Sequence, residues 1–489
     1  MTRYLPLIFP LALLTLAWAQ ESPEGPGAKP AASQPTKTVK TDGGPKTAAA
    51  RMGSTFRDET VGWGLRVRGV LGYGLVLLIG YLLSTARGRI RWRTVLWGLG
   101  LQAIFALIVL NPVVGDFFFN SVDRGVKALL GFAEAGMDFV FSATVPHKVT
   151  YVGSEGRTVT EIVIGHMSPV LKSFAFWILP TVIFFSSLIT LLYHLGVMQW
   201  VVKGMARAMV YMMGTSGAET LSCTANIFVG QTEAPLLVKP FVEKMTTSEL
   251  MAVMTGGFAT VAGGVLAIYV MMLQGIPGIA GHLVTASIMA APCALAVAKL
   301  MFPETDTPAT GGQIQVQVER PDQNAIEAAA RGASEGMSLV LNIAAMLIAF
   351  VGLMAMINAV LHLFGTSVEQ ILGWILSPLA WSMGVPWDGQ ATQVGQLMGE
   401  KLVLTELIAY KHLQGILNGN AAILSRRTAV ISSYALCGFA NVASIGIQIG
   451  GIGGMAPSRR GDLARLGLRA MFAGAMVSCL SGTLAGFLV

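Results

Sequence analysis

Charged residues are scarce in this sequence. Asp, Glu, Lys and Arg make up 12% of its 489 residues, and hydrophobic residues make up 53%. An average soluble domain has about 25% charged residues, so this composition excludes an ordinary soluble domain and is typical of a polytopic membrane protein. The 33 basic residues exceed the 26 acidic ones, and we interpret this excess as a signal of membrane topology.

Patterns that bind metals or nucleic acids are also missing. The four cysteines lie in apolar segments and form no Cys-x-x-Cys pair, which favours a role as small core residues. The six histidines are scattered, so sequence neighbours cannot build a zinc site. Basic residues do not alternate with aromatic ones along any stripe. We therefore expect no structural metal, no cofactor and no nucleic-acid partner.

The N-terminal segment differs from the rest of the chain. Residues 1–19 contain Arg3, an apolar run over 5–16 and an Ala17-Trp18-Ala19 exit, which together predict a signal-peptide-like segment. Residues 20–54 are rich in Pro, Ala and Lys and almost free of aliphatic and aromatic residues. That composition predicts a disordered tail.

A polar run interrupts an apolar region near the middle of the chain, from Asn226 to Glu233, with Pro235 after it. The flanks at 215–225 and 236–244 hold about 10 residues each, half of the roughly 20 that a helix needs to cross a bilayer. We interpret them as two half-helices of a re-entrant hairpin, because backbone broken at membrane depth must line a cavity or be buried in protein. Glu233 at the tip would be costly in hydrocarbon and so indicates a functional site.

The same arrangement occurs twice. Thr405-Glu406 recurs inside a second short apolar pair at about 392–414, and residues 257–263 after the first hairpin match 438–444 after the second at five of seven positions. Each half therefore contains a hairpin followed by a Gly-interrupted helix. Paired broken segments in two halves indicate a transporter whose substrate site lies at the repeat interface near the bilayer midplane.

Counting spans gives the fold class. With basic clusters placed in the cytoplasm, the sequence predicts an all-α polytopic membrane protein with about eight transmembrane helices and two re-entrant hairpins in an inverted repeat. Arg426 and Arg427 are the exception, because they fall on the external face. The predicted spans are 67–84, 95–114, 174–196, 250–273, 282–302, 337–364, 429–450 and 466–489, with an interfacial helix around 122–141 followed by an external loop.

These spans define the predicted organisation. N-terminal transmembrane helices and the interfacial helix occupy 67–196, a first repeat occupies 214–302, and a cytoplasmic linker occupies 303–336. A connecting transmembrane helix at 337–364 then leads to a second repeat at 374–489.

Three segments together resemble the concentrative nucleoside transporter family. They are residues 230–236, 399–410 and 434–441, and the similarity extends from about residue 67 to the C-terminus. The resemblance implies a bacterial multi-pass protein of the cytoplasmic (inner) membrane that assembles as a homotrimer. It also implies that each protomer has its own substrate site between two hairpins and two unwound helices.

The resemblance implies roles for individual residues as well. A nucleoside requires carboxylate, amide and hydroxyl partners in an otherwise apolar pocket, and the matching positions supply all three. Those implied to face the nucleobase are Gln231, Thr232 and Glu233 with Val265, and those implied to hold the ribose are Glu406, Asn441 and Ser444 with Phe439.

The family's sodium site corresponds to the side chains of Asn226 and Thr260 and to the carbonyls of Val229, Thr260 and Val261. Neutral oxygens of this kind suit a hard monovalent cation at half-helix C-terminal ends. The favoured function is therefore a sodium-driven nucleoside symporter. Two alternatives stay open: a proton-coupled symporter, with Glu233 or Glu406 as the titrating group, and a non-transporting nucleoside receptor or gate. An enzyme is not expected, because it would need a nucleophile, a base or a metal set, and the sequence pairs neither Glu233 nor Glu406 with such a group.

Overall fold

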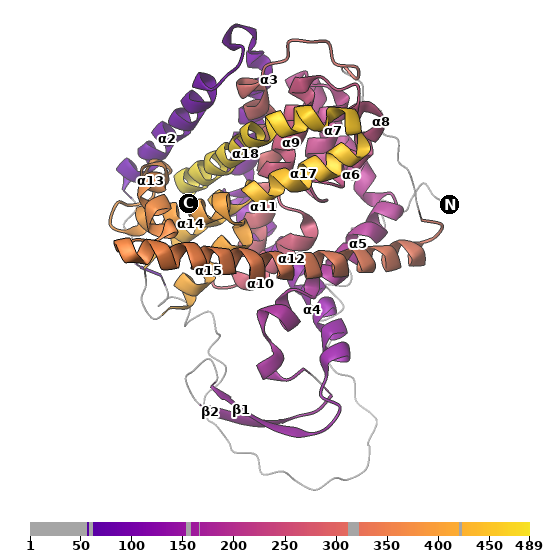
Figure 1. The fold of residues 1–489 in the computed structure, drawn as a ribbon, viewed down its shortest axis with the longest axis vertical. Coiled ribbons are helices and arrows are strands. Elements are labelled where there is room, and N and C mark those ends of the chain that lie inside the picture. Colours follow the sequence, from indigo (N-terminus) through magenta and orange to yellow (C-terminus); the bar gives the residue numbers. More distant parts are fainter. Residues whose placement is uncertain (1–55, 58–61, 153–157, 166, 312–321, 420–422) are drawn as a thin grey trace.

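The structure is a computed structural model that describes residues 56–57, 62–152, 158–165, 167–311, 322–419 and 423–489. The predicted signal-peptide-like segment and disordered tail, 1–19 and 20–54, lie outside the described residues. The described chain is mostly helical, as predicted (Figure 1). Seven of its helices are long and apolar enough to cross a membrane.

Two apolar helices and one long amphipathic helix form the N-terminal part. The predicted span at 95–114 ends early, at Val109, because the residue before Pro112 is disfavoured in helical conformation while Pro112 itself suits the first turn of the next helix. The amphipathic helix thus begins well before residue 122, and Phe119 packs against His282 with ring centroids 4.6 Å apart. These elements are α2 (Trp63–Leu82), α3 (Trp92–Val109) and α4 (Pro112–Phe141).

The predicted external loop contains a small sheet, which the prediction of an all-α chain missed. Strands β1 (His147–Val152) and β2 (Thr158–Val163) pair antiparallel and lie at the lower end of Figure 1, away from the helical body. Both strands are rich in Val, Thr and Ile, which favour strands, and glycines separate them in the sequence. A polar sequence with short β-branched runs therefore formed a hairpin instead of an irregular loop.

The first repeat contains the predicted hairpin. Its entering half is α7, capped at Ser216 by a reciprocal pair with Glu219, and its returning half is a 3₁₀ turn, η7, followed by the short helix α8. The Gly-interrupted helix that follows is also present as two halves, α9 and α10. The elements are α5 (Thr181–His194), α6 (Val197–Met213), α7 (Gly217–Ala225), η7 (Ala234–Val238), α8 (Lys239–Val242), α9 (Thr247–Ala259), α10 (Gly263–Met272) and α11 (Ile279–Met301).

A single helix of 37 residues, α12 (Ala325–Leu361), connects the two repeats and runs across the molecule in Figure 1. It begins inside the range predicted as a linker, so the linker is shorter than predicted and the connecting helix is longer. Asn324 caps it by accepting hydrogen bonds from the N–H groups of Ile326 and Glu327, both at 3.0 Å. The residues that follow are mostly Ala and Glu, which are strong helix formers.

The second repeat follows the plan of the first, with one addition. Helix α13 packs along the hairpin and was not predicted. The predicted span at 429–450 is divided into α16 and α17, of 11 and 14 residues, so neither is long enough to cross alone. The elements are α13 (Val368–Ser382), α14 (Gln390–Val403), α15 (Glu406–Asn418), α16 (Arg426–Leu436), α17 (Val442–Met455) and α18 (Arg460–Leu488).

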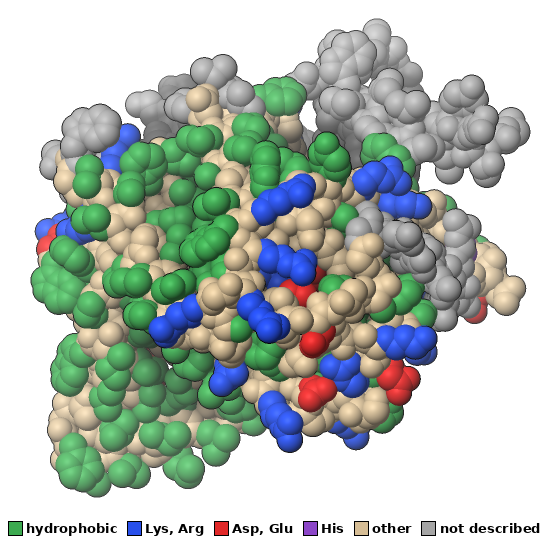
Figure 2. Space-filling view, turned by 90° about the horizontal axis from the view of Figure 1, so that it is seen from above, with side chains coloured by type: hydrophobic (Ala, Val, Ile, Leu, Met, Phe, Trp, Pro, Cys, Tyr) green, Lys and Arg blue, Asp and Glu red, His purple; other side chains and the backbone are tan. Residues whose placement is uncertain are grey.

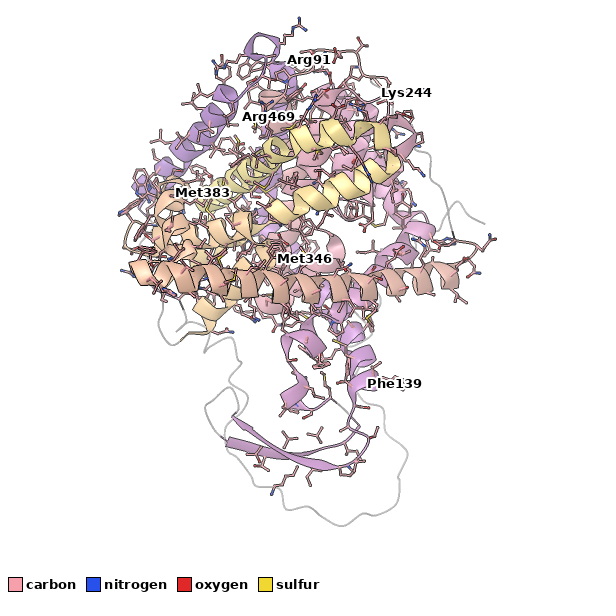
Figure 3. All side chains as sticks on the ribbon, in the orientation of Figure 1. Arg91, Phe139, Lys244, Met346, Met383 and Arg469 are labelled. Carbon is pink, nitrogen blue, oxygen red and sulfur yellow. The ribbon has the colours of Figure 1, made fainter. Side chains whose placement is uncertain are left out.

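Arg91 and Arg469, which belong to basic clusters predicted to be cytoplasmic, lie on one face. Both are at the upper end of Figure 3, where Lys244 also lies, and Figure 2 shows Lys and Arg side chains gathered there. Arg427, one of the two exceptions, is 4% exposed and donates to the Gly384 carbonyl at 2.7 Å and to the Gly486 carbonyl at 3.1 Å. It stabilises buried backbone, so its position carries no topology signal.

The two broken helices cross where both are unwound. Gly438, in the break between α16 and α17, has a φ of +110°, a conformation that favours glycine. A Cβ atom there would lie 2.7 Å from the Phe258 carbonyl oxygen and 2.8 Å from that of Ala259 at the end of α9. The close backbone approach at Gly438 therefore brings the two repeats together at the centre of the molecule.

We expect Gly438→Ala to lower the thermal unfolding temperature of the purified protein. The left-handed conformation alone costs about 1–2 kcal/mol for a residue with a side chain, and the steric overlap adds to it. Gly446→Ala is the matched control, because a Cβ atom at Gly446 in α17 meets open space. Equal unfolding temperatures for the two variants would contradict the crossing geometry.

Candidate functional site

A cavity of about 220 Å³ lies where the two hairpin tips and the two broken helices meet. All eight residues that the sequence predicts to contact substrate line it, although they come from four separate segments of the chain. They are Gln231, Thr232 and Glu233 from the first tip, Val265 from α10, Glu406 from the second tip, and Phe439, Asn441 and Ser444 from the break before α17 and its first turn. The structure brings the predicted site together in one place.

Glu406 is the most firmly held of these residues. One carboxylate oxygen accepts a hydrogen bond from the Tyr269 hydroxyl at 2.7 Å, and the other accepts one from the Asn441 amide at 2.9 Å. Its side chain is 5% exposed. A carboxylate offers about four acceptor positions, so two fixed donors orient Glu406 and leave acceptor capacity for a ligand in the cavity.

A chain of hydrogen bonds continues from Asn441 to the first hairpin. The Asn441 side chain caps α17 by accepting from the Ser444 N–H at 2.8 Å, and the Ser444 hydroxyl accepts from Gln231 at 3.3 Å. Gln448 then donates to the Gln231 amide oxygen at 3.0 Å and to the Met254 carbonyl at 3.2 Å. The groups predicted to read the base and those predicted to hold the sugar thus belong to one network.

Glu233 is held within its own hairpin tip. Its carboxylate accepts a hydrogen bond from the Gly230 N–H, which closes the turn. Glu233 also lines a second cavity of about 250 Å³, formed with α5 and α12, that shares Gly230 and Val265 with the first. The carboxylate therefore stands at the boundary between the two cavities.

Charged residues line the far side of the second cavity. Arg331 binds both oxygens of Asp322, at 2.7 and 2.8 Å, and also Glu335 at 2.7 Å. The hydrogen bonds from the Arg331 guanidinium hold the pKa of the Asp322 carboxyl below its usual range. This end of the second cavity is polar, whereas the side shared with the first cavity is mostly apolar.

Helix ends supply the electrostatics of the first cavity. Glu406 is the first residue of α15, with Thr405 as its N-cap, and Asn441 is the N-cap of α17. The N-terminal end of a helix carries roughly half a positive charge, which stabilises a carboxylate there. Ala262, the N-cap of α10, lines the same cavity. Three helix N-termini thus face the ligand position.

The sequence analysis missed one wall of the cavity. Helix α12 closes it with Leu339, Ile343, Met346 and Leu347 and with a single amide side chain, Asn342. An amide in the middle of an apolar transmembrane helix is costly unless it faces a cavity or a partner. That cost is the signal that could have identified Asn342.

The predicted sodium ligands lie where two helix C-termini come together. Asn226 is the C-cap of α7 and Thr260 is the C-cap of α9. The two segments are joined by a hydrogen bond from the Gly263 N–H to the Phe228 carbonyl, at 3.0 Å. Val261, next to Thr260, is 1% exposed.

The residues present fit a monovalent cation. Asn226 is 1% exposed, yet neither atom of its side-chain amide has a hydrogen-bond partner among the described residues. A buried amide without a partner costs about 1–3 kcal/mol, and a cation bound by its oxygen would offset part of that cost. The Thr260 hydroxyl donates its proton to the Gly256 carbonyl at 3.0 Å, which leaves its lone pairs available to a cation. Helix C-termini also favour positive charge.

Two hairpin-containing repeats around a buried polar cavity define a secondary transport protein of the membrane. Models of the Na⁺ dependent nucleoside transporter N-terminus and C-terminus match residues 71–144 and 282–486, and a nucleoside recognition gate model matches residues 175–275. The chain belongs to the concentrative nucleoside transporter family, as its sequence predicted. This is a family of transporters and not of enzymes.

Individual relatives agree with this assignment. An uncharacterized transporter of Haemophilus influenzae is 42% identical over 429 residues, which cover 86% of this chain and 97% of that protein. Sodium/nucleoside cotransporter 2 of Mus musculus is 38% identical over 85% of this chain and 62% of its own length. The structure of CNTnw in an inward-facing substrate-bound state is 40% identical, with a TM-score of 0.76 over 87% of this chain and 98% of that one.

We expect Glu406→Gln to weaken nucleoside binding to the purified protein by about 1.5–3 kcal/mol, the contribution of a hydrogen bond to a charged group. This corresponds to roughly 10- to 150-fold in the dissociation constant measured by calorimetry. Glu369→Gln is the matched control, because Glu369 lies at the start of α13 and accepts hydrogen bonds from Asn358 at 2.9 Å. Near-native affinity in Glu406→Gln would remove Glu406 from the substrate site.

Proposed function

We propose that this protein is a secondary active symporter that imports nucleosides across the bacterial cytoplasmic membrane with a sodium gradient. The observation that supports this most directly is the unpartnered Asn226 amide, which lies four residues before Gly230, a lining residue of the cavity that gathers all eight predicted substrate residues. A cation site and a polar substrate cavity built on the same hairpin are the arrangement that couples two solutes. The homotrimer implied by the family resemblance stays a prediction.

Ribose recognition falls to the second repeat. Glu406 accepts hydrogen bonds from sugar hydroxyls while Tyr269 and Asn441 hold its two oxygens in place. Its position at the start of α15 favours the charged form of the carboxylate, and a charged acceptor strengthens those bonds. A sugar lacking a hydroxyl would leave buried polar groups unpaired, so the site discriminates against deoxynucleosides.

Base recognition falls to the first repeat. Gln231 presents an amide whose orientation is set by Gln448 and Ser444, and Thr232 packs its methyl group against Gly451 of α17. An amide offers both donors and an acceptor, which the mixed edge of a nucleobase requires. Val265 and Phe439 supply the apolar surface for the flat faces of the base.

Sodium, when bound, supplies a positive charge between the C-termini of α7 and α9. Asn226 and Thr260 would hold it with their side-chain oxygens, together with the carbonyls of Val229, Thr260 and Val261. The same segment accepts the hydrogen bond from the Gly263 N–H to the Phe228 carbonyl, which joins the first hairpin tip to the broken helix. Residues that hold the ion and residues that read the base are therefore separated by only a few positions on one tip.

Two other functions compete with this proposal. In a proton-coupled symporter, Glu233 or Glu406 would exchange a proton, yet Glu406 is already fixed by two donors suited to a carboxylate. A nucleoside receptor or gate would need only one half of the molecule, whereas both complete repeats contribute to the cavity. The similarity to the mouse sodium/nucleoside cotransporter 2 also supports symport.

Uptake of labelled uridine into proteoliposomes tests the proposed function. We expect accumulation above the external concentration when sodium is outside, and loss of accumulation when choline replaces sodium. Uptake that is unchanged in choline and abolished by a protonophore would establish proton coupling. Binding without any accumulation would establish a receptor.

Thr260→Val tests the sodium ligands themselves. The substitution keeps the side-chain volume and removes the hydroxyl, so we expect a higher sodium concentration for half-maximal uptake with little change in the unfolding temperature. Losing one hydroxyl ligand should shift that concentration by about 5- to 10-fold, the equivalent of one neutral hydrogen bond. Thr255→Val is the matched control, because Thr255 lies earlier in α9 and bonds only to the Met251 carbonyl, at 2.7 Å. Equal sodium dependence in both variants would refute the assignment of Thr260.

A further inference from the structure

Lys401, in α14 of the second hairpin, is buried in the core of the protein with 2% of its surface exposed. Its ammonium donates three hydrogen bonds: to the carbonyls of Ala435 and Cys437, at 3.0 and 3.1 Å, and to the Ser478 hydroxyl at 2.8 Å. All three partners are neutral oxygens. A lysine almost never lies this deep unless it is paired, and these partners include no carboxylate.

The surroundings offset the cost of this charge. Helix α16 ends at Leu436, so the carbonyls of Ala435 and Cys437 belong to the last turn and the break, where backbone oxygens have no helical partner. The C-terminal end of a helix carries partial negative charge that favours a cation. The Ser478 hydroxyl also donates to the Cys437 carbonyl, at 2.5 Å, which orients the oxygen toward the ammonium.

This set of ligands has the same chemistry as the predicted sodium site of the first repeat. Both sets include backbone carbonyls at the C-terminal end of the first half of a broken helix, together with a hydroxyl. The first set adds the Asn226 amide and the Val229 carbonyl from the hairpin, and the hydroxyl of the second set, Ser478, comes from α18. In the first repeat the Asn226 amide has no partner among the described residues. In the second repeat the oxygens of Ala435, Cys437 and Ser478 already bind the Lys401 ammonium.

We propose that the carbonyls of Ala435 and Cys437 and the Ser478 hydroxyl form a second monovalent-cation site, which the Lys401 ammonium fills from within the chain. In this proposal the site of the first repeat binds a free sodium ion, whereas the site of the second repeat is occupied by the covalently attached Lys401 ammonium. The comparison with sodium rests on the proposed function, whereas the occupancy of the second site rests on the contacts of Lys401 alone.

The tethered ammonium affects the nucleoside site through the backbone. Cys437 opens the break, and at the next residue, Gly438, a Cβ atom would lie 2.7 Å from the Phe258 carbonyl oxygen. The break ends at Asn441. Asn441 donates to Glu406 and caps α17. Lys401 is thus a positioning residue: it holds the unwound segment in the shape that presents Asn441 to the cavity.

Removing the side chain should therefore create a site that a free ammonium ion can fill. In Lys401→Ala we expect the dissociation constant for uridine, measured by calorimetry in sodium buffer, to rise about tenfold, the loss of one hydrogen bond to a charged group. Ethylammonium should restore binding and raise the unfolding temperature of this variant. Tetraethylammonium, which has no N–H group, should do neither.

Two controls separate this effect from general stabilisation. Ethylammonium should leave the native protein unchanged, because its site is filled. It should also leave Lys203→Ala unchanged, because Lys203 is an exposed residue of α6. Both measurements use binding and unfolding in sodium, so failure of the sodium-coupling proposal would leave their outcome intact.

The opposite results overturn the proposal. Lys401→Met keeps the length of the side chain without its charge, so native affinity and native unfolding temperature in that variant would mean that the site requires no cation. Failure of ethylammonium to restore folded Lys401→Ala would mean the same. If Lys401→Ala does not fold, the yields of folded Lys401→Arg and Lys401→Met are compared instead. The proposal requires a higher yield of folded protein for Lys401→Arg, and an equal or higher yield for Lys401→Met would overturn it.

Discussion

Broken backbone at membrane depth is the constraint on which this structure depends. Every N–H and C=O group freed by a break needs a partner, because water is not available to supply one. At the first tip, the Gly263 N–H donates to the freed Phe228 carbonyl, and at the second tip the Thr405 side chain caps α15. In the break before α17, the Asn441 side chain caps the helix and the Lys401 ammonium donates to the Cys437 carbonyl. The polar groups that satisfy the backbone are the same groups, or neighbours of the groups, that face the cavity.

The breaks also sort charge. Helix N-termini at Glu406, Asn441 and Ala262 converge on the cavity, while the C-termini of α7, α9 and α16 converge on oxygen clusters suited to cations. A continuous helix would place both ends at the membrane surface, where water screens them. Dividing the helices moves their partial charges into a low-dielectric interior, where each is worth more.

The elements that could be predicted from the sequence are those whose polar groups have a high free-energy cost inside a membrane. A polar run between two half-length apolar segments predicted each hairpin tip, and the repeated Gly-containing motif predicted the interrupted helices. The structure has a helix break at all four places. The site residues came from the family resemblance, and the structure gathers them. Asn342 could not be assigned to the cavity from the sequence, because the sequence does not tell which helix closes the cavity. The burial of Arg427 against Gly384 and Gly486 is a tertiary contact, so the sequence alone could not separate Arg427 from basic residues that mark topology. Helix α13 and the β1–β2 hairpin were missed because their local patterns were too short or too polar to stand out.

The wall formed by α12 differs in kind from the other walls of the cavity. Directional hydrogen-bonding groups come almost wholly from the two repeats, whereas α12 offers aliphatic and thioether surface and the one amide of Asn342. Apolar contact has no preferred angle and little preferred register, so it resists sliding weakly. A displacement of the repeats along α12 would leave a bound solute's hydrogen bonds to the repeats intact and would change only its apolar contacts with α12 and its contact with Asn342.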